Sequence, residues 1–331
     1  MALKKKKQIK SKPLSDYIFP EHKKMPENEF RIDCFNRCVI YTVNRSKRPQ
    51  QFSQPKVVKS TKPADCVFCQ GNESKTPKEI CRYEERGKWQ IRVIPNKFYG
   101  VHPAYEKAYG RHEVIIETPE HFKTFSEITP KQTVKLFEIF QERYAAHMAD
   151  KKVKSVMIFK NEGPLGGASL EHTHWQLVSS DILYPENDKY VEYFKNYPEE
   201  QLKRWLDSEK ERFFYKNKNV VVFCPYVSKF NFEVWVVPKK LSIDFEKMTK
   251  EEIKDFAMAT HKAIGAIDKM LNFPSYNIVL FPSEKGENLQ THIQIYPRIS
   301  NWAGFEYGTN CAFNSVLPEV ASQELKKNIK R

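Results

Sequence analysis

The sequence predicts an α+β fold in which two similar halves follow one another along the chain. Four pairs of short segments match in the same order, at offsets of 118 to 122 residues, as Glu113–Pro119 does with Glu233–Pro238. Short β-rich runs follow one another without an intervening helix, which favours antiparallel pairing. We therefore expect antiparallel sheets with packed helices, built from a duplicated unit.

The expected strands are short runs rich in β-branched and aromatic residues. In the first half they cover 91–94, 112–117, 155–160 and 174–179, and in the second half 219–223, 232–237, 277–281 and 291–296. The other matched pairs are 125–129 with 245–249, 158–159 with 280–281, and 173–176 with 291–294. Each half thus has the order strand, strand, helix, strand, loop, strand.

The expected helix of each half starts at a capping box, Thr129-x-x-Gln132 in the first and Thr249-x-x-Glu252 in the second. Apolar residues then recur at helical spacing. They are Leu136, Phe140, Tyr144 and Met148 in the first helix, and Ile253, Phe256, Ile264, Ile267 and Leu271 in the second.

Length and composition predict a globular chain with a basic tail at 1–24, a first half at 25–184, a helical connector at 185–217 and a second half at 218–331. No apolar run of about 18 residues and no secretory signal is found, so we expect no membrane partner and a cytosolic location. Seven scattered cysteines agree with a reducing compartment. The formal charge of +14 is concentrated in the two ends, which argues against a nucleic-acid partner.

One stretch concentrates glycines and histidines, Gly163-Pro-Leu-Gly-Gly-Ala-Ser-Leu-Glu-His-Thr-His-Trp-Gln-Leu177. Side chains alternate on a strand, so His172, His174 and Gln176 form one row on one face. The glycines before them supply backbone N–H groups that can approach an anion closely. A phosphate beside two imidazoles is one interpretation, and an ordinary half-exposed strand is the other.

The pair Cys66-x-x-Cys69 presents two thiols to one point. Such a turn is typical of a tetrahedral zinc site that takes two further ligands from elsewhere. The spacing alone leaves three alternatives open: Cys34 with Cys38 as the further pair, histidines, or two core cysteines without a metal.

Several runs together resemble the galactose-1-phosphate uridylyltransferase family of the histidine-triad superfamily. They are Cys66–Pro77, Val93–Phe98, Glu117–His121, Phe159–Gln176, Pro297–Thr309 and Pro318–Glu319, in order over roughly residues 30–321. The resemblance implies two histidine-triad-like halves, a homodimer, and transfer of a nucleoside monophosphate, most often UMP, between a nucleoside diphosphate sugar and a sugar 1-phosphate.

The resemblance also implies roles for individual residues. His174 corresponds to a nucleophile that carries the nucleotide, with Gln176 beside it, and one structural zinc is held by Cys66, Cys69, His121 and His172. Residues at nucleotide- and phosphate-binding positions are Arg45, Arg48, Asn96, Asn161, Gly167 and Ser169. Glu306 matches a sugar-binding residue that reaches the partner subunit's site. Cys34 and Cys38 then have a structural role.

Some positions depart from the family's pattern. Thr173 stands where proline is common and Trp175 precedes Gln176, so we expect a less fixed backbone there. Phe305 replaces a frequent tyrosine. The second copy keeps His292 and Gln294 but lacks the first histidine, the glycine loop and the cysteine pair, so we expect His292 to be a relic or a packing residue. His112 is expected to be structural.

Gln176 can donate a hydrogen bond but no proton, which favours transfer to a good leaving group over hydrolysis. Two other functions stay open at this point. One is a phosphorylase of ADP-glucose or of a dinucleoside polyphosphate, with phosphate as acceptor. The other is a non-catalytic nucleotide-binding protein.

Overall fold

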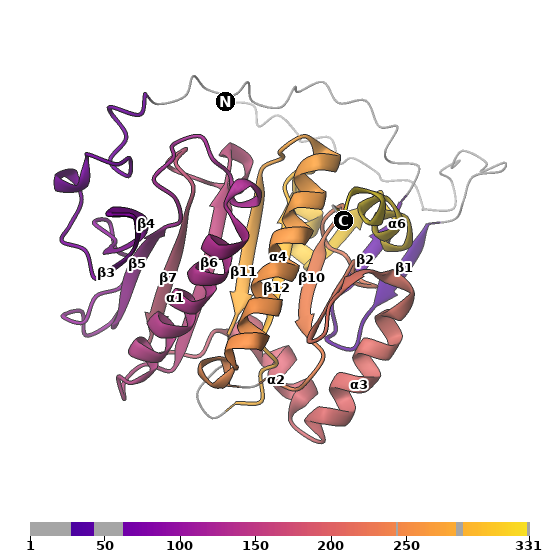
Figure 1. Ribbon diagram of the computed structural model, residues 1–331. Helices are drawn as coiled ribbons and strands as arrows, with labels where there is room; N and C mark the ends of the chain where they lie inside the picture. The colour runs from indigo at the N-terminus through magenta and orange to yellow at the C-terminus, as the bar shows by residue number, and fades with distance from the viewer. Residues whose placement is uncertain (1–27, 43–61, 243, 283–286, 330–331) are drawn as a thin grey trace, which may run out of the picture.

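The computed structural model describes residues 28–42, 62–242, 244–282 and 287–329. Ten strands of these residues form one antiparallel sheet (Figure 1). Their order across the sheet is β3 (Cys81–Glu85), β4 (Lys88–Pro95), β5 (Gly110–Ile116), β7 (His174–Ser180), β6 (Ser155–Glu162), β11 (Tyr276–Phe281), β12 (His292–Pro297), β10 (Val234–Pro238), β9 (Val220–Phe223) and β8 (Phe213–Lys216).

A second, three-stranded sheet brings the two ends of the described chain together. It consists of β1 (Glu29–Ile32), β2 (Cys38–Tyr41) and β13 (Cys311–Asn314). Strands β1 and β2 are antiparallel, whereas β2 and β13 are parallel. The sequence analysis missed all three of these strands, because each has only four residues and no alternation long enough to detect.

The helices are α1 (Pro130–Met148), α2 (Asp188–Phe194), α3 (Pro198–Glu209), α4 (Lys250–Leu271), α5 (Gly304–Thr309) and α6 (Pro318–Asn328). Short 3-10 turns are η3 (Glu73–Lys75), η4 (Phe125–Glu127), η5 (Pro164–Gly166), η6 (Pro185–Asn187), η7 (Lys210–Arg212) and η8 (Phe245–Lys247). No helix of the described residues is long and apolar enough to cross a membrane. The α+β class with antiparallel pairing and packed helices is confirmed.

The two copies are joined edge to edge. Strand β6 of the first copy pairs with β11 of the second, with Phe159 opposite Val279. The long helices α1 and α4 lie side by side across one face of the sheet (Figure 1). The domain limits at residues 184, 185, 217 and 218 stay predictions, and the tail at 1–24 lies outside the described residues. Strand β8 lies inside the predicted connector and extends the sheet.

The caps of α1 and α4 differ in one detail. In α4, Thr249 and Glu252 form the complete reciprocal box. In α1, Thr129 accepts from the backbone N–H of Gln132, but the Gln132 amide donates to the carbonyls of Gln90 and Glu117 instead. The predicted bond between the Gln132 side chain and the backbone of Thr129 is therefore wrong, because the Gln132 amide connects the helix to the sheet instead.

The opposite face of the sheet is covered unevenly. Over the second copy, α2 and α3 contribute aromatic residues such as Tyr190 and Trp205 that pack on Trp235. At the junction of the two copies, a groove of about 780 Å³ follows the sheet and is lined by Phe159 and Asn161 of β6 and by Asn277 and Gln294 of the second copy. The predicted row of His174 and Gln176 lies beside this groove, since Gln176 pairs with Phe159.

Candidate functional site

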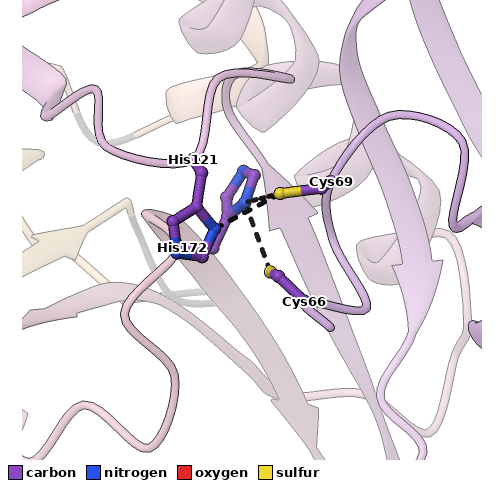
Figure 2. A group of neighbouring side chains, drawn as sticks. All are labelled: Cys66, Cys69, His121 and His172. Carbon is purple, nitrogen blue, oxygen red and sulfur yellow. Dashed lines mark hydrogen bonds between the residues drawn. The ribbon is translucent and has the colours of Figure 1, made fainter. Parts of the chain in front are cut away.

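Four buried side chains converge on one point, as the resemblance implied. They are Cys66, Cys69, His121 and His172, whose candidate ligand atoms all lie within 4.8 Å of one another (Figure 2). The Sγ of Cys69 is 3.2 Å from Nδ1 of His121 and 3.5 Å from Nδ1 of His172, and Cys66 Sγ is 3.5 Å from the latter. In a tetrahedral zinc site with bonds of about 2.3 Å to sulfur and 2.0 Å to nitrogen, these atoms would be separated by about 3.5 Å. The group therefore fits a metal of this kind.

The surroundings of both imidazoles suit metal ligands. Nε2 of His172 donates to the carbonyl of Thr118 at 2.8 Å, which leaves the lone pair on Nδ1 facing the cysteines. Nε2 of His121 lies 3.7 Å from a carboxylate oxygen of Glu171. Burial lowers the pKa of His172 to about 4, so this imidazole is neutral near pH 7. Neutral imidazole is the form that binds a metal.

His174 begins β7 and lies two residues beyond the metal group. Its Nδ1–H donates to the backbone carbonyl of His172 at 2.8 Å, so Nε2 carries the free lone pair. None of the described residues bonds to Nε2. Burial lowers the pKa of His174 to about 4, and the ring packs edge-on against Phe68 at 5.3 Å. The geometry presents a neutral imidazole with one defined nucleophilic nitrogen.

The fully buried carboxylate of Glu117 holds the segment that contains His174, by binding the side chains that alternate with the histidines. Glu117 accepts hydrogen bonds from Thr173 Oγ1 and Trp175 Nε1, and from Lys160 Nζ at 2.8 Å. Lys160 is itself completely buried and lies 3.0 Å from Glu162. The expectation that Thr173 and Trp175 leave the backbone less fixed is therefore wrong, because both departures from the family pattern are anchored on Glu117.

The glycine loop is held by the second copy. Gly163 has φ of 70°, and a Cβ there would lie 2.3 Å from Ser275 Oγ, so only glycine fits. Asn277 of β11 donates to the carbonyl of Gly166 at 2.7 Å and to Asn161 Oδ1 at 2.8 Å. The predicted phosphate loop thus rests on residues about 110 positions further along the chain.

The other predicted binding residues are placed as follows. Asn161, Gly167 and Ser169 lie on or beside the glycine loop, before the His174 strand. Asn96 follows β4, and its Nδ2 lies 3.1 Å from Nε2 of His112. Arg45 and Arg48 lie outside the described residues.

Glu306 lies on α5. It is buried, and one carboxylate oxygen accepts from the backbone N–H of Ala303 at 2.9 Å. Within the described chain none of its hydrogen bonds reaches the His174 strand. A role for Glu306 at the site of the same chain therefore has no support, and its predicted contact with a sugar in a partner subunit's site is untested.

Sequence reasoning missed four residues that support the site: Glu117, Lys160, Asn277 and His112. The last of these was expected to be structural, but its Nε2 lies 2.8 Å from Oε1 of Gln176. Strand alternation could have placed His112 on the same face as Gln176. It could not have shown that β5 and β7 are neighbours.

The second copy retains part of the geometry in a closed environment. His292 Nδ1 donates to the carbonyl of Gln290 at 2.8 Å, as His174 does to His172. Its ring stacks on Phe281 at 4.6 Å and on Trp235 at 5.1 Å, and it is 2% exposed. These contacts agree with the packing role expected for His292.

A larger groove, about 1100 Å³, lies elsewhere. It is lined by α3, β8 and Lys326, and holds several lysines but none of the predicted site residues. The candidate site is therefore chosen by its converging side chains and not by the size of a groove.

The chain is similar in sequence to known proteins. Residues 96–184 match the family model for galactose-1-phosphate uridyl transferase, N-terminal domain. ADP-glucose phosphorylase of Arabidopsis thaliana is 28% identical over 316 residues, covering 88% of this chain and 90% of that one. Galactose-1-phosphate uridylyltransferase of Thermotoga maritima is 28% identical over 240 residues, covering 67% and 75%.

Solved structures show the same fold. The Arabidopsis thaliana ADP-glucose phosphorylase with bound ADP-glucose matches with a TM-score of 0.78 and 25% identity, over 91% of this chain and 99% of that one. A uridylyltransferase structure matches with a TM-score of 0.70 and 22% identity, over 92% and 98%. The motifs, the fold and these matches together support a relation to the galactose-1-phosphate uridylyltransferase-like family of nucleotidyltransferases, whose N-terminal-domain model residues 96–184 match.

Proposed function

We propose that the protein transfers a nucleoside monophosphate from a nucleoside diphosphate hexose to an acceptor, through a covalent bond to His174. The observation that carries this proposal is the bond from His174 Nδ1 to the carbonyl of His172, which fixes Nε2 as the nucleophilic nitrogen. The Asn277-supported glycine loop comes just before it in the chain.

The reaction has two displacements at phosphorus. In the first, Nε2 attacks the α-phosphorus, a nitrogen–phosphorus bond forms, and the bond to the oxygen of the hexose 1-phosphate breaks. In the second, an acceptor phosphate oxygen attacks the same phosphorus and His174 leaves as neutral imidazole. Splitting one transfer into two steps through a nucleophile lowers each barrier. A hexose 1-phosphate leaves as an anion, so no general acid is needed.

Charge develops on the non-bridging phosphoryl oxygens during both steps. The amide of Gln176, Ser169 and the backbone N–H groups of 166–169 are the donors that we assign to them. Asn161 and Gly167 would hold the phosphates with them, and Asn96, Arg45 and Arg48 would bind the nucleotide. Preorganised donors of this kind stabilise a transition state without reorganising during the reaction.

Two substrate pairs are candidates. The first is ADP-glucose with phosphate as acceptor, supported by a relative named ADP-glucose phosphorylase that is similar over 88% of this chain. The second is transfer of UMP between hexose 1-phosphates, the pair that the sequence resemblance implied, supported by the match of residues 96–184 to the uridyl transferase model. Glu306 would contact the sugar from the partner subunit of a homodimer, and the expected location stays the cytosol.

We propose zinc as the metal of the two-cysteine, two-histidine group. Its two thiolates and two imidazole nitrogens match the preference of this ion. When bound, it would tie three separate segments of the chain together and would take no part in the displacements. With all four ligands supplied by protein, it would be a structural metal.

The test is a panel of donors, ADP-glucose, UDP-glucose, UDP-galactose and diadenosine polyphosphates, each labelled in the base and offered without acceptor. We expect one donor to leave up to one label per chain in an acid-labile, base-stable bond, with a matching burst of sugar phosphate. His174→Ala should lose the label, and the control His261→Ala, on α4 across the sheet, should keep it.

Phosphate or a hexose 1-phosphate, added afterwards, should discharge the label and identify the acceptor. Label that persists in His174→Ala, or steady hydrolysis without label, would refute the proposal. Tight nucleotide binding without label or turnover would establish the non-catalytic alternative.

A further inference from the structure

His112 is hydrogen-bonded to Gln176, a residue of the proposed transfer site. It lies on β5, and its Nε2 is 2.8 Å from Oε1 of Gln176 on the neighbouring strand β7. The backbone N–H of Gly100 points at the other ring nitrogen, Nδ1, at 3.4 Å. Nδ1 is therefore the acceptor and Nε2 carries the hydrogen, which it donates to the Gln176 oxygen. Burial lowers the pKa of His112, which keeps the ring in this neutral form near pH 7.

Asn96 contacts the same ring nitrogen. Its Nδ2 lies 3.1 Å from Nε2 of His112, while its Oδ1 accepts from the backbone N–H of Phe98. One nitrogen cannot donate to Gln176 and accept from Asn96 at once. The Gly100 contact decides between the two, because it places the acceptor at Nδ1.

The orientation of the Gln176 amide follows from this bond. An amide has an acceptor oxygen on one side and a donor NH₂ on the other, and rotation by half a turn exchanges them. With the oxygen held by His112, the NH₂ group is the part left for the site, and no described residue bonds to it. The reversed amide would present an oxygen to the negative phosphoryl oxygens and repel them.

The second copy shows the same device with a different donor. The Oε1 of Gln294 accepts from the hydroxyl of Tyr296, and its Nε2 lies 2.8 Å from Nε2 of His292. There too the glutamine oxygen is fixed by a neighbour, and the amide nitrogen faces the histidine two residues earlier. The second copy thus provides a further example of a glutamine held with its NH₂ toward the histidine.

We propose that His112 is a positioning residue that locks the amide of Gln176 with its oxygen toward β5 and its NH₂ toward the phosphoryl group transferred to His174. The inference rests on the proposed function, because it assigns the locked NH₂ a role in stabilising the charge that develops there. His112 touches neither the phosphorus nor the leaving group and acts only through Gln176.

Two nearly isosteric substitutions separate this role from simple packing. In His112→Gln, the side-chain NH₂ can take the place of Nε2–H and keep Gln176 in its orientation. In His112→Glu, the carboxylate can only accept, so Gln176 must turn its NH₂ toward residue 112 and its oxygen toward the substrate. Both variants fill similar space, so their melting temperatures show whether either change disturbs the fold.

The assay is the single-turnover rate of label transfer to the enzyme, with the apparent dissociation constant of the donor measured in parallel. We expect His112→Gln to stay within about threefold of the wild type and His112→Glu to lose on the order of 100-fold in rate, the usual effect of removing one preorganised donor. The dissociation constant should change little. In a Gln176→Ala background, His112→Glu should change the rate by no more than about twofold, since its effect passes through Gln176.

Equal rates for His112→Glu and the wild type, or the same large loss in the Gln176→Ala background, would overturn the proposal. A second measurement does not depend on activity: ¹⁵N shifts of histidine-labelled protein, assigned by the signal missing in His112→Gln, should show the Nε2–H tautomer. The Nδ1–H tautomer would refute the locking bond even if no donor labels the enzyme. Absence of label with every donor would instead contradict the proposed function.

Discussion

Replacing Glu117 by glutamine tests how the site strand is held. Glu117 is fully buried and accepts from Lys160, Thr173 and Trp175. Glutamine has the same shape but only one acceptor oxygen, and its NH₂ would face groups that are themselves donors. Lys160 would keep a single ionic partner, Glu162, at 3.0 Å.

The size of the effect follows from burial. Removing one member of a buried ion pair costs about 3–5 kcal/mol, because the remaining charge is left uncompensated. Unfolding entropy of about 2.1 cal/mol/K per residue gives about 0.7 kcal/mol/K for a chain of this length. We therefore expect Glu117→Gln to lower the melting temperature by about 4–7 °C. Label transfer to His174 should also slow, because the neighbouring Thr173 and Trp175 lose their anchor.

Thermal unfolding followed by circular dichroism measures the first effect, and the single-turnover assay measures the second. Glu162→Gln is the matched control, since its carboxylate is partly exposed and its loss should cost no more than about 1 kcal/mol. Adding Lys160→Met to Glu117→Gln should restore part of the lost stability by removing the unpaired charge. A Glu117→Gln protein that melts within about 1 °C of the wild type would refute the reasoning.

Three further predictions concern other parts of the molecule. Cys69→Ser should lower both the metal content, expected at about one zinc per chain, and the melting temperature. The control Cys34→Ser should change neither the metal content nor the metal-dependent stability. A stable wild-type protein without metal would contradict this prediction. Glu306→Gln, which can still accept from Ala303, should raise the Michaelis constant for the acceptor and leave labelling by the donor unchanged. An unchanged Michaelis constant for the acceptor would limit Glu306 to capping α5. Burial raises the pKa of Asp268 to about 7, with Glu162 and Glu127 adding to the effect and Ser126 and Lys160 opposing it. The stability that the protonated carboxyl contributes is therefore lost as pH rises from about 4 to 7, by up to about 1.4 kcal/mol per pH unit. The stability of Asp268→Asn relative to the wild type should grow over that range and then level off. A pH-independent difference between the two proteins in denaturant titrations would contradict this prediction.

The sequence by itself determined the repeated elements. All eight strands of the duplicated unit and both long helices lie within a few residues of their predicted positions, for example β7 at His174–Ser180 and α4 at Lys250–Leu271. Hydrophobic periodicity and helix caps are local properties, so a single segment contains enough information to place them. The row of His174 and Gln176, together with the glycines before it, was visible for the same reason.

The tertiary structure decided everything that depends on which segments are neighbours. Strand alternation places His112 on a face, but only the pairing of β5 with β7 brings its ring to Gln176. Likewise, only the β6–β11 junction shows that Asn277 supports the glycine loop of the other copy. The metal group joins cysteines and histidines that lie up to 106 residues apart, and spacing alone left its second pair of ligands open.

Short strands and buried charges mark the remaining limit of the sequence. Strand β13 pairs with β2 across more than 270 positions of the chain, and four residues carry no periodic signal of their own. Glu117 and Lys160 look like ordinary surface charges in the sequence, because charged residues are rarely buried. Their burial becomes favourable only when the fold supplies each with a partner, which is why the anchor behind His174 could be recognised only in the folded protein.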